Sequence, residues 1–358
     1  MRNGPDDEEG SKQVAHHCQL YTMNHHQWSF PLTALNATPT NRSLHRELYD
    51  RARGIEFLFR LGSSLLLPTS AILTAAAWFH RFYMRFSMED YHRQDVAASC
   101  IFLATKTEEC ARKLRDVARV CQAKIHGQEA KIDAKDIEIC QAQILLTEEA
   151  LLEALCFDYV VESPHCKLVD LFDAHDVDLL VQECAWSFAH DSFRTTLCIH
   201  YPAHIIATAC YVLAQRAVDG PNSMSLDARI ASSASRASLP TPPTHKLPSP
   251  DPSRFAIEHF SFTDAQLVSV AECLSILLEF YRAQEAKDHP HLSYAVNVAP
   301  PANTPPRSRL YIPRAEVEAS EAAAPAPPPN PLDDFASGRT PNSSHGGRTP
   351  AAASQVES

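Results

Sequence analysis

The chain has 358 residues, which is enough for two domains and additional tails, because single hydrophobic cores seldom grow to this length. Its formal net charge of −11 and its sequence pI near 5.9 disfavour a surface built to bind the phosphate backbone of nucleic acid. Acidic residues also outnumber basic ones between Arg42 and Arg216, so the acidic balance is not confined to the termini. Only 9 glycines accompany 26 prolines, which predicts ordered segments separated by proline-rich ones.

The cysteine pattern and the lack of long apolar runs bear on the compartment. The 11 cysteines stand singly, without the CxxC spacing of zinc or redox sites, and we interpret them as core residues in a reducing compartment. No signal peptide opens the sequence, and no run approaches the ~20 apolar residues that span a bilayer. We therefore expect an intracellular protein that makes no contact with a membrane.

Residues 1–27 are polar and show no helical or strand periodicity, so we predict that this segment is disordered. It contains the pairs His16–His17 and His25–His26, which could in principle bind zinc. Histidines in a segment without a predicted scaffold more often bind nothing, and we expect no metal.

Five amphipathic segments follow, each with apolar residues that repeat every three or four positions. The first segment ends before Pro68, and the third contains Ala97, Ala98 and Ala104, whose small side chains allow neighbouring helices to approach closely. Residues 28–160 are therefore predicted to form one helical bundle. Its helices lie in "SLHRELYDRARGIEFLFRL", "TSAILTAAAWFHRFYMRF", "RQDVAASCIFLATKTEE", "KLRDVARVCQA" and "KDIEICQAQILLTEEALLEALCFDYV".

The helical pattern starts again after the break at Ser163–Pro164 and predicts a second bundle over residues 161–285. Residues 219–254 are rich in Ser and Pro, cannot bury enough apolar surface to offset their chain entropy, and are predicted to form a disordered insertion. The Pro- and Ala-rich residues 286–358 are predicted to be a disordered tail for the same reason. No β pattern of any length occurs, so the fold class is all-α.

The sequence contains no recognisable catalytic or phosphate-binding motif. Walker A, GxGxxG, HExxH and GxSxG patterns are absent, and 9 glycines are few for a chain with a phosphate-binding loop. His80, His92 and His204 lie on predicted helices without a matching catalytic partner, so each is interpreted as a structural histidine. We expect neither an enzyme active site nor a cofactor.

Two charged residues stand within apolar helical stripes. Lys106 follows Phe102 by four residues, and Glu148 follows Ile144 by four. Both charges could be solvated where the stripes reach the surface, or could pair with each other for less than ~1 kcal/mol. They could equally belong to a binding site, because a charge among apolar neighbours needs a partner.

Several stretches resemble the cyclin box, and together they cover residues 28–283 apart from the Ser/Pro insertion. The resemblance implies two tandem five-helix cyclin-box bundles. In the first half it is carried by "HRFYM" (80–84), "AASCIFLATKTEE" (97–109), "RKLRDVARV" (112–120) and "ILLTEEALLEALCFDY" (144–159). In the second half it is carried by "RTTLCIHYPAHIIATACYVLAQR" (194–216) and "LVSVAECLSILLEFYR" (267–282).

Within this superfamily the sequence is most similar to the transcriptional cyclins of the K, L and T type. Among them it resembles the fungal beta subunit of the kinase that phosphorylates the RNA polymerase II C-terminal domain, through "HRFY", "EECARKL", "WSF" (28–30) and "TPT" (38–40). The resemblance implies a nuclear regulatory subunit, not an enzyme, which binds and activates a cyclin-dependent kinase and so regulates transcription elongation. The polymerase tail would be the substrate of the complex, and a third subunit is left open.

The resemblance also implies roles for Lys106 and Glu148, which match the family's lysine and glutamate that hold the kinase beside its regulatory helix. Five apolar residues are implied to shape the kinase-binding groove or its floor, although each also fits plain core packing: Phe82, Phe102, Leu103, Ile144 and Leu151. The basic residues Arg112, Arg115 and Arg119 could meet a phosphate or an acidic partner, but a solvated helix face is the simpler interpretation.

Two features depart from the cell-cycle members of the family. In those cyclins an Arg–Asp bridge joins the first and second helices; Arg51 fits the arginine, but His80 stands where the acid would be. They also carry an apolar substrate-docking motif on the first helix, which "DRARGIEFL" does not reproduce. Docking of substrates through that patch is therefore not expected.

Five Ser/Thr-Pro sites in the insertion and tail are candidates for phosphorylation by the bound kinase, which would add close to −2 charge at each. They are Thr241, Ser249, Thr304, Thr340 and Thr349.

An alternative function is a nucleic-acid-binding transcription factor, because the TFIIB core also consists of paired cyclin-like folds. The acidic balance and the match at Lys106 and Glu148 argue against it, and direct binding to nucleic acid is not expected. A third reading, a metalloenzyme that uses the clustered histidines, lacks the carboxylate or cysteine spacing of such a site.

Overall fold

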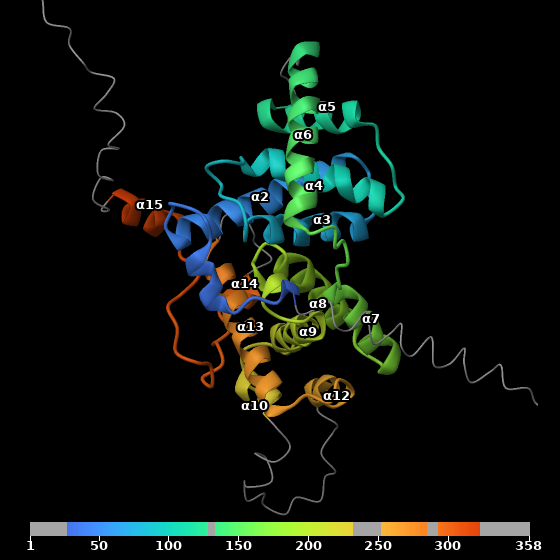
Figure 1. Ribbon diagram of the computed structural model, residues 1–358. Coiled ribbons are helices and arrows are strands. Elements are labelled where there is room, and N and C mark those ends of the chain that lie inside the picture. Colours follow the sequence, from blue (N-terminus) through green and yellow to red (C-terminus); the bar gives the residue numbers. More distant parts are fainter. Residues whose placement is uncertain (1–26, 128–132, 232–251, 285–292, 323–358) are drawn as a thin grey trace, which may run out of the picture. The chain divides into compact units, whose positions relative to one another are not determined.

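A computed structural model describes residues 27–127, 133–231, 252–284 and 293–322, and within these ranges the only regular secondary structure is helical. The all-α prediction is confirmed for this part of the chain. The elements, labelled as in Figure 1, are η2 (Leu32–Ala37), α2 (Leu44–Ser64), α3 (Thr69–Phe82), α4 (Arg93–Thr107), α5 (Leu114–His126), α6 (Ala134–Ala154), α7 (Pro164–Ala174), α8 (Leu179–Ser192), η3 (Leu197–Ile199), α9 (Ala203–Asp219), α10 (Leu226–Ile230), α12 (Pro252–His259), α13 (Asp264–Ala283), α14 (Ser293–Val296) and α15 (Arg314–Ala322).

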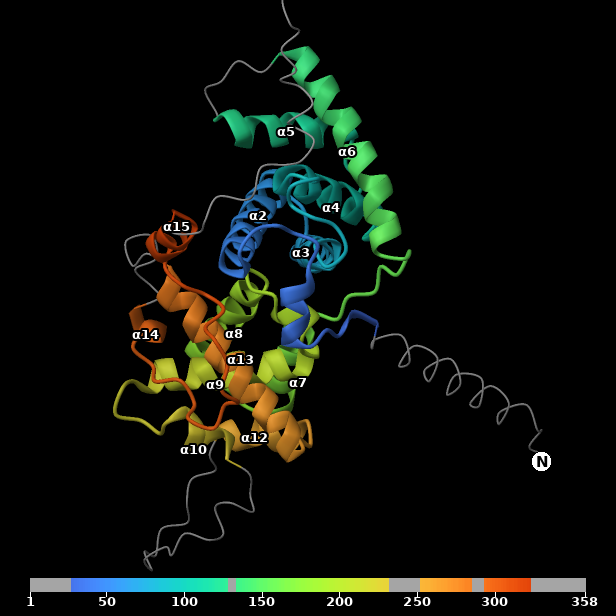
Figure 2. The same ribbon diagram turned by 60° about the vertical axis from the view of Figure 1, so that its left-hand side comes forward.

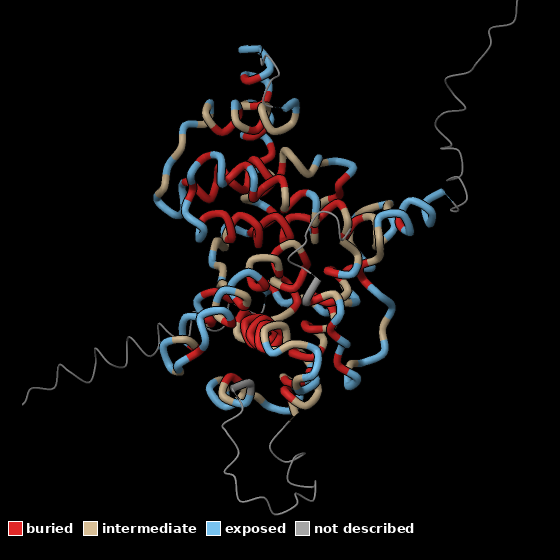
Figure 3. Tube along the Cα trace, turned by 180° about the vertical axis from the view of Figure 1, so that it is seen from behind, coloured by how far each residue is buried: buried red, intermediate tan, exposed pale blue. Residues whose placement is uncertain are grey.

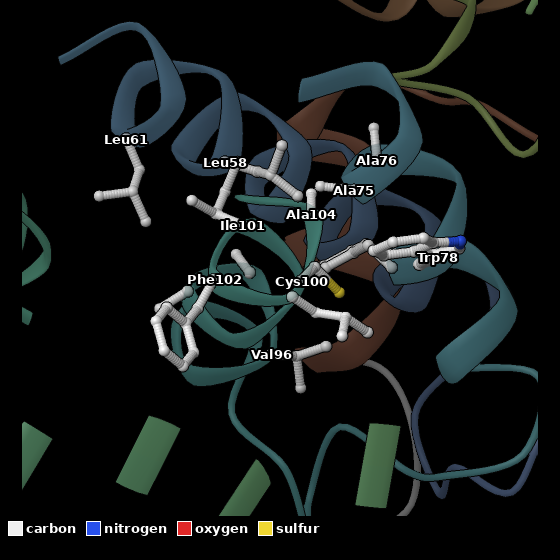
Figure 4. Packing of buried hydrophobic residues seen from close by; sticks show 14 of the residues in the cluster. Leu58, Leu61, Ala75, Ala76, Trp78, Val96, Cys100, Ile101, Phe102 and Ala104 are labelled. Atoms are coloured by element: carbon white, nitrogen blue, oxygen red, sulfur yellow. The ribbon is translucent and has the colours of Figure 1, made fainter. Parts of the chain in front are cut away.

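The first bundle is organised around α4, which contacts α2, α3, α5 and α6. Every residue of α4 from Val96 to Thr105 is buried, because alanines and a serine alternate with larger apolar side chains and let the four neighbours approach. Figure 4 shows Ile101 and Ala104 of α4 among side chains of α2 and α3. Since α4 is central, the direction in which its last turn leaves the core is fixed by all four neighbours.

The packing of α2 against α3 depends on a glycine and on a buried arginine. A Cβ at Gly54 would lie 2.3 Å from Cζ of Phe79, so only glycine permits this approach of the two helices. Arg51 is fully buried and donates to the carboxylate of Glu47 at 2.6 Å. It also donates to the carbonyl oxygens of His80 (2.9 Å) and Tyr83 (2.7 Å). The acid missing from α3 is thus supplied by Glu47 of α2 itself, and α3 contributes backbone carbonyls.

The second bundle is organised around α9, which contacts α7, α8, α10, α12, α13 and α14. Residues 205–215 of α9 are all buried, and the same run appears as a continuous buried helix in Figure 3. The helix begins after Pro202, and it ends at Gly220, whose φ of 81° favours glycine. The helix α13, which packs on α9, starts with the capping box of Thr263 and Gln266.

The two bundles share their cores across the predicted boundary at residue 160. Phe193 of the second half packs in the first core, whereas Leu35 and Leu48 of the first half pack in the second. His80 is fully buried and donates from Nε2 to the carbonyl oxygen of Phe193 at 2.8 Å. Because this bond joins α3 to the end of α8, His80 links the two halves.

The predicted limits of two disordered segments need correction. Residues 219–231, assigned to the disordered insertion, include α10 with the buried residues Leu226 and Ile230. Residues 293–322, assigned to the disordered tail, include Leu310 and Tyr311, which are buried in the second core. The prediction from composition misplaced the limits of both segments. A single large apolar residue within a Ser- and Pro-rich segment can still pack against a neighbouring element. The remaining residues of these segments, and residues 1–26, lie outside the described part of the chain.

Among the described helices, none combines the length and the apolar character that crossing a lipid bilayer requires.

The first turns of α6 extend beyond α5 in Figures 1 and 2, and residues 134–136 there are exposed.

The burial of His80 predicts that acid destabilises the fold. Burial, with the nearby charge of Arg51, lowers the pKa of His80 from 6.5 to about 3. Between these values the unfolded chain holds a proton that the folded chain does not, so stability is complete above pH 6.5 and is lost as the pH falls toward 3. We expect His80→Gln, which keeps an N–H donor, to lessen the slope of unfolding free energy against pH by about 1.4 kcal/mol per unit. Urea unfolding of both proteins from pH 7.5 to 5 measures this, and equal slopes would contradict it.

Candidate partner-binding site

Close packing of α4 on α6 brings the two predicted charged residues together. Ser99 of α4 is fully buried, and its hydroxyl lies 3.0 Å from the carbonyl oxygen of Ile144 on α6. From this contact the two helices run on to Lys106, in the last turn of α4, and to Glu148, four residues after Ile144. The backbone arrangement therefore places both side chains on the same side of the bundle.

Lys106 and Glu148 form a bidentate ion pair. The Nζ atom of Lys106 lies 2.7 Å and 2.8 Å from the two carboxylate oxygens of Glu148. The lysine side chain is 47% exposed, whereas that of the glutamate is 8% exposed. Pairing is thus the arrangement that the structure shows among those that sequence analysis left open. The pair is asymmetric, because the cation is open to solvent and the anion is covered by protein.

Aromatic side chains surround the ion pair. The Nζ atom of Lys106 also lies 4.2 Å from the centroid of the Phe102 ring, which is a cation–π contact. Burial and the carboxylate of Glu148 raise the pKa of the Tyr159 hydroxyl, so this tyrosine lies close to the pair from the segment after α6. The lysine is thus held by a carboxylate and an aromatic face, while part of it remains accessible.

The five apolar residues assigned to the groove or its floor are all core residues of the first bundle. Phe82, Ile144 and Leu151 are at most 1% exposed, and Leu103 and Phe102 are 5% and 8% exposed. In this structure they position α4 and α6 and offer little surface to a partner. Helical periodicity places Phe102 and Leu103 near Lys106, and Ile144 and Leu151 near Glu148. Periodicity does not tell which of these neighbours is exposed to solvent.

Sequence analysis did not single out several apolar side chains on α6 and just after it that reach the surface. Leu145 and Leu152 are three residues before and four after Glu148, so they share its face of α6; Leu145 is exposed and Leu152 is half-buried. Phe157, just after α6, is 67% exposed and has a φ of 57°. Its N–H donates to the carbonyl oxygen of Leu152, which closes the helix end.

Phe157 combines exposure with a left-handed backbone, as does Leu66, which is 83% exposed and has a φ of 53°. A phenylalanine at positive φ is strained by roughly 1 kcal/mol, and an exposed aromatic ring gains nothing from core burial. Sequence analysis placed Phe157 inside the fifth predicted helix, whereas α6 ends at Ala154 in the structure. The side chains of Leu145, Leu152 and Phe157 together with Lys106 and Glu148 are called the α4/α6 site below.

The basic residues at the start of α5 serve different purposes. Arg112 is committed to backbone carbonyl groups, including those of Leu65 and Leu66 at 3.0 Å, and fastens the α4–α5 connection to the end of α2. Arg119 pairs with Asp116 at 3.1 Å on the exposed face of α5. These contacts agree with a structural role for Arg112 and with a solvated basic face that includes Arg119.

The structure bears on only part of the remaining candidate sites. Of the five Ser/Thr-Pro sites, Thr304 is described, while Thr241, Ser249, Thr340 and Thr349 lie outside the described residues. Throughout the described ranges, no three side chains of His, Cys, Asp or Glu are close enough together to hold a metal ion. The histidine pairs at 16–17 and 25–26 fall outside those ranges.

Two helical bundles that present a half-exposed ion pair and exposed apolar side chains have the features of a protein-binding module. Comparison with protein families gives the class. Residues 31–160 match the family model "Cyclin, N-terminal domain". Among solved structures, a chain of the "yeast RNA Pol II CTD kinase CTDK-1 complex" has the same fold, with a TM-score of 0.53 and 20% identity over 85% of each chain. Residues 31–160 are therefore similar to the N-terminal domain of cyclins.

Similar sequences include cyclins of several named types. The chain is 39% identical to Cyclin pch1 of Schizosaccharomyces pombe over 203 residues, which are 54% of this chain and 58% of that protein. It is 35% identical to Cyclin-T1-3 of Oryza sativa subsp. japonica over 48% of this chain and 36% of the relative. It is 31% identical to Cyclin-K of Danio rerio over 53% of this chain and 45% of the relative. The matched region therefore spans less than two thirds of each of these relatives.

The asymmetry of the ion pair predicts unequal effects on stability. Lys106→Met leaves a mostly buried carboxylate without its cation, and we expect a loss of roughly 1 to 2 kcal/mol in unfolding free energy. Glu148→Gln leaves a lysine that water can solvate, and we expect a loss below ~1 kcal/mol. Urea unfolding at pH 7 of both variants, with the exposed Lys113→Met as the control, tests the order. A larger loss in Glu148→Gln than in Lys106→Met would refute the explanation.

Proposed function

We propose that this chain is the regulatory cyclin subunit of a transcriptional cyclin-dependent kinase that phosphorylates the RNA polymerase II C-terminal domain and so regulates transcription elongation. The observation that carries the proposal is the Lys106–Glu148 pair, half exposed on a cyclin N-terminal domain. The relatives named cyclin T and cyclin K support the transcriptional type. Catalysis belongs to the kinase partner, and the complex acts in the nucleus.

The geometry supports a contact in which the partner adds to an existing interaction. Because Glu148 already holds Lys106 in place, the lysine loses little side-chain freedom when a second polypeptide arrives. Its exposed N–H groups can donate to backbone carbonyl groups of the partner. Leu145, Leu152 and Phe157 supply the apolar area around this polar centre, which is the usual composition of an interface.

Docking at the α4/α6 site would activate the kinase by selecting one position of its regulatory helix. A kinase is active only when its own Lys–Glu pair and its metal-binding aspartate are aligned on ATP. A cyclin that binds the inward position of that helix more tightly than the outward position shifts the population toward the active form. Phe82, Phe102, Leu103, Ile144 and Leu151 contribute from beneath, by keeping α4 and α6 rigid.

A nucleic-acid-binding function in the manner of TFIIB is not favoured by any feature of the described residues. Arg112 and Arg119, the obvious basic candidates, are occupied by carbonyl and carboxylate partners. The net charge of −11 opposes binding to a phosphate backbone. We leave a third subunit as an addition that the proposed kinase complex permits but does not require.

Truncation of the ion pair is expected to impair activation more than assembly. An interface of ~2,000 Å² survives two small truncations, but Lys106→Ala or Glu148→Ala should lower kinase activation by about 2 to 4 kcal/mol, roughly 30- to 1,000-fold. The measurement is co-purification of the kinase with each tagged variant, followed by its activity on a polymerase-tail peptide. Lys113→Ala, an exposed lysine on α5, is the control. Full activation by both pair variants would exclude the proposed site.

Phe157 is expected to contribute to affinity. Phe157→Ser removes exposed aromatic area and should weaken kinase binding by at least 2 kcal/mol, or about 30-fold, if the ring is buried in the complex. The isolated protein should be no less stable, since the ring contacts mainly water. Leu179→Ser is the matched control, because Leu179 is 68% exposed but lies on α8 of the second bundle. Equal dissociation constants for the wild type and Phe157→Ser would remove Phe157 from the site.

A further inference from the structure

The segment between α14 and α15, residues 297–313, is bound to the second bundle and is called the strap below. Arg282 in the last turn of α13 donates to the carbonyl oxygens of Val296 (3.3 Å) and Val298 (2.6 Å). Farther along, Leu310 and Tyr311 are buried, and the Tyr311 ring lies 5.4 Å from that of Phe280 on α13. The strap is thus anchored at its beginning and at its end.

Two carboxylates hold the middle of the strap. Asp227 on α10 accepts hydrogen bonds from the backbone N–H groups of Ala302 (2.9 Å) and Asn303 (3.4 Å). Glu279 on α13 pairs with Arg307 at 2.9 Å and accepts from the backbone N–H of Leu310 at 3.0 Å. Both members of the Arg307–Glu279 pair are mostly covered, with side-chain exposures of 17% and 15%.

Thr304 lies between these two anchors and has the features of a kinase substrate. It precedes Pro305, is half-buried, and belongs to no helix. The residues on either side of it at 302, 303, 305 and 306 are exposed, so a kinase can reach the segment in extended form. No other part of the strap has a Ser or Thr followed by proline.

We propose that Thr304 is a phosphorylation site and that its phosphorylation releases the strap from the second bundle. In the reaction Thr304 Oγ1 forms a bond to the γ-phosphorus of ATP while the bond from that phosphorus to ADP breaks, and the hydroxyl proton passes to the base of the kinase. The inference does not depend on the proposed function, because any proline-directed kinase can supply the phosphate.

Two consequences of the added charge act in the same direction. The phosphate carries close to −2 on the residue that follows Asn303, whose N–H donates to Asp227, so its charge opposes that of the carboxylate. Arg307 and Arg309 are the cations of the strap that can pair with the phosphate, and Arg307 is the one that also holds Glu279. If Arg307 turns toward the phosphate, Glu279 is left mostly covered and without its cation, which weakens the second anchor.

Release of the strap would uncover part of α13. Tyr311 covers Phe280, and its hydroxyl accepts a hydrogen bond from the N–H of Thr196 at 3.2 Å. His45 of α2 donates to the carbonyl oxygen of Leu310 at 3.0 Å, so the strap also joins the second bundle to the first. Phosphorylation would therefore change a surface that involves both bundles and lies away from α4 and α6.

Hydrogen–deuterium exchange of the full chain tests this inference. The substrate protein carries Thr241→Ala, Ser249→Ala, Thr340→Ala and Thr349→Ala, so that Thr304 is the remaining Ser/Thr-Pro site of the insertion and tail. A purified proline-directed kinase and ATP supply the phosphate, and Thr304→Val, treated in the same way, is the unmodified control. We expect at least tenfold faster exchange of amides in residues 302–311 after phosphorylation, with unchanged exchange in α4 and α6.

Asp227→Asn separates electrostatic release from a general loosening. Asparagine can still accept from the two backbone N–H groups but carries no charge, so phosphorylation should accelerate exchange less in this variant than in the parent. Failure of Thr304 to accept phosphate while the free peptide 299–312 is phosphorylated would overturn the site. Stoichiometric phosphorylation with unchanged or slower exchange in residues 302–311 would overturn the release.

Discussion

Close packing of α4 against four other helices is the constraint on which the candidate site depends. A helix that is buried on all sides for ten residues cannot rotate or shift without opening cavities, so its last turn leaves the core in one direction. Lys106 is on that turn, and Glu148 is on the neighbour that packs along it. The precision of a 2.7 Å ion pair at the surface therefore comes from alanines and a serine in the core, which contact no partner themselves.

The same constraint explains how the first bundle tolerates unusual charged groups. Arg51 is fully buried, and a buried guanidinium is stable only when its donors are satisfied. Glu47 provides the opposite charge from one turn earlier on the same helix, and carbonyl groups at the end of α3 accept the other N–H groups. His80 is then free to stay neutral and to bond to Phe193. The exchange of an acid for histidine is compensated within α2 and used to join the two bundles.

Helical periodicity and small-residue spacing predicted the all-α fold and the five helices of the first bundle, and they left the pairing of Lys106 with Glu148 as one of several possibilities. These features depend on local sequence and on repeats of three and four, which a sequence displays directly. The exposure of Phe157 and the burial of Ile144 and Leu151 could not be predicted in the same way. Whether a side chain beside a charge faces water is decided by the angle between helices, and that angle depends on contacts distant in sequence. The burial of Tyr311 was not predicted for a similar reason, because the ring that it packs against, Phe280, is on another element.

Two ion pairs of the chain differ in which member water can reach, and this difference determines what can disturb them. In the α4/α6 site the cation is about half exposed, so another polypeptide can approach it while the carboxylate keeps its position. In the strap both charges are mostly covered, and a macromolecule has no direct access to either. Only a new charge on the strap itself can compete for Arg307. An open pair therefore suits recognition by a partner, whereas a covered pair in a segment that contains a Ser/Thr-Pro site suits control by chemical modification.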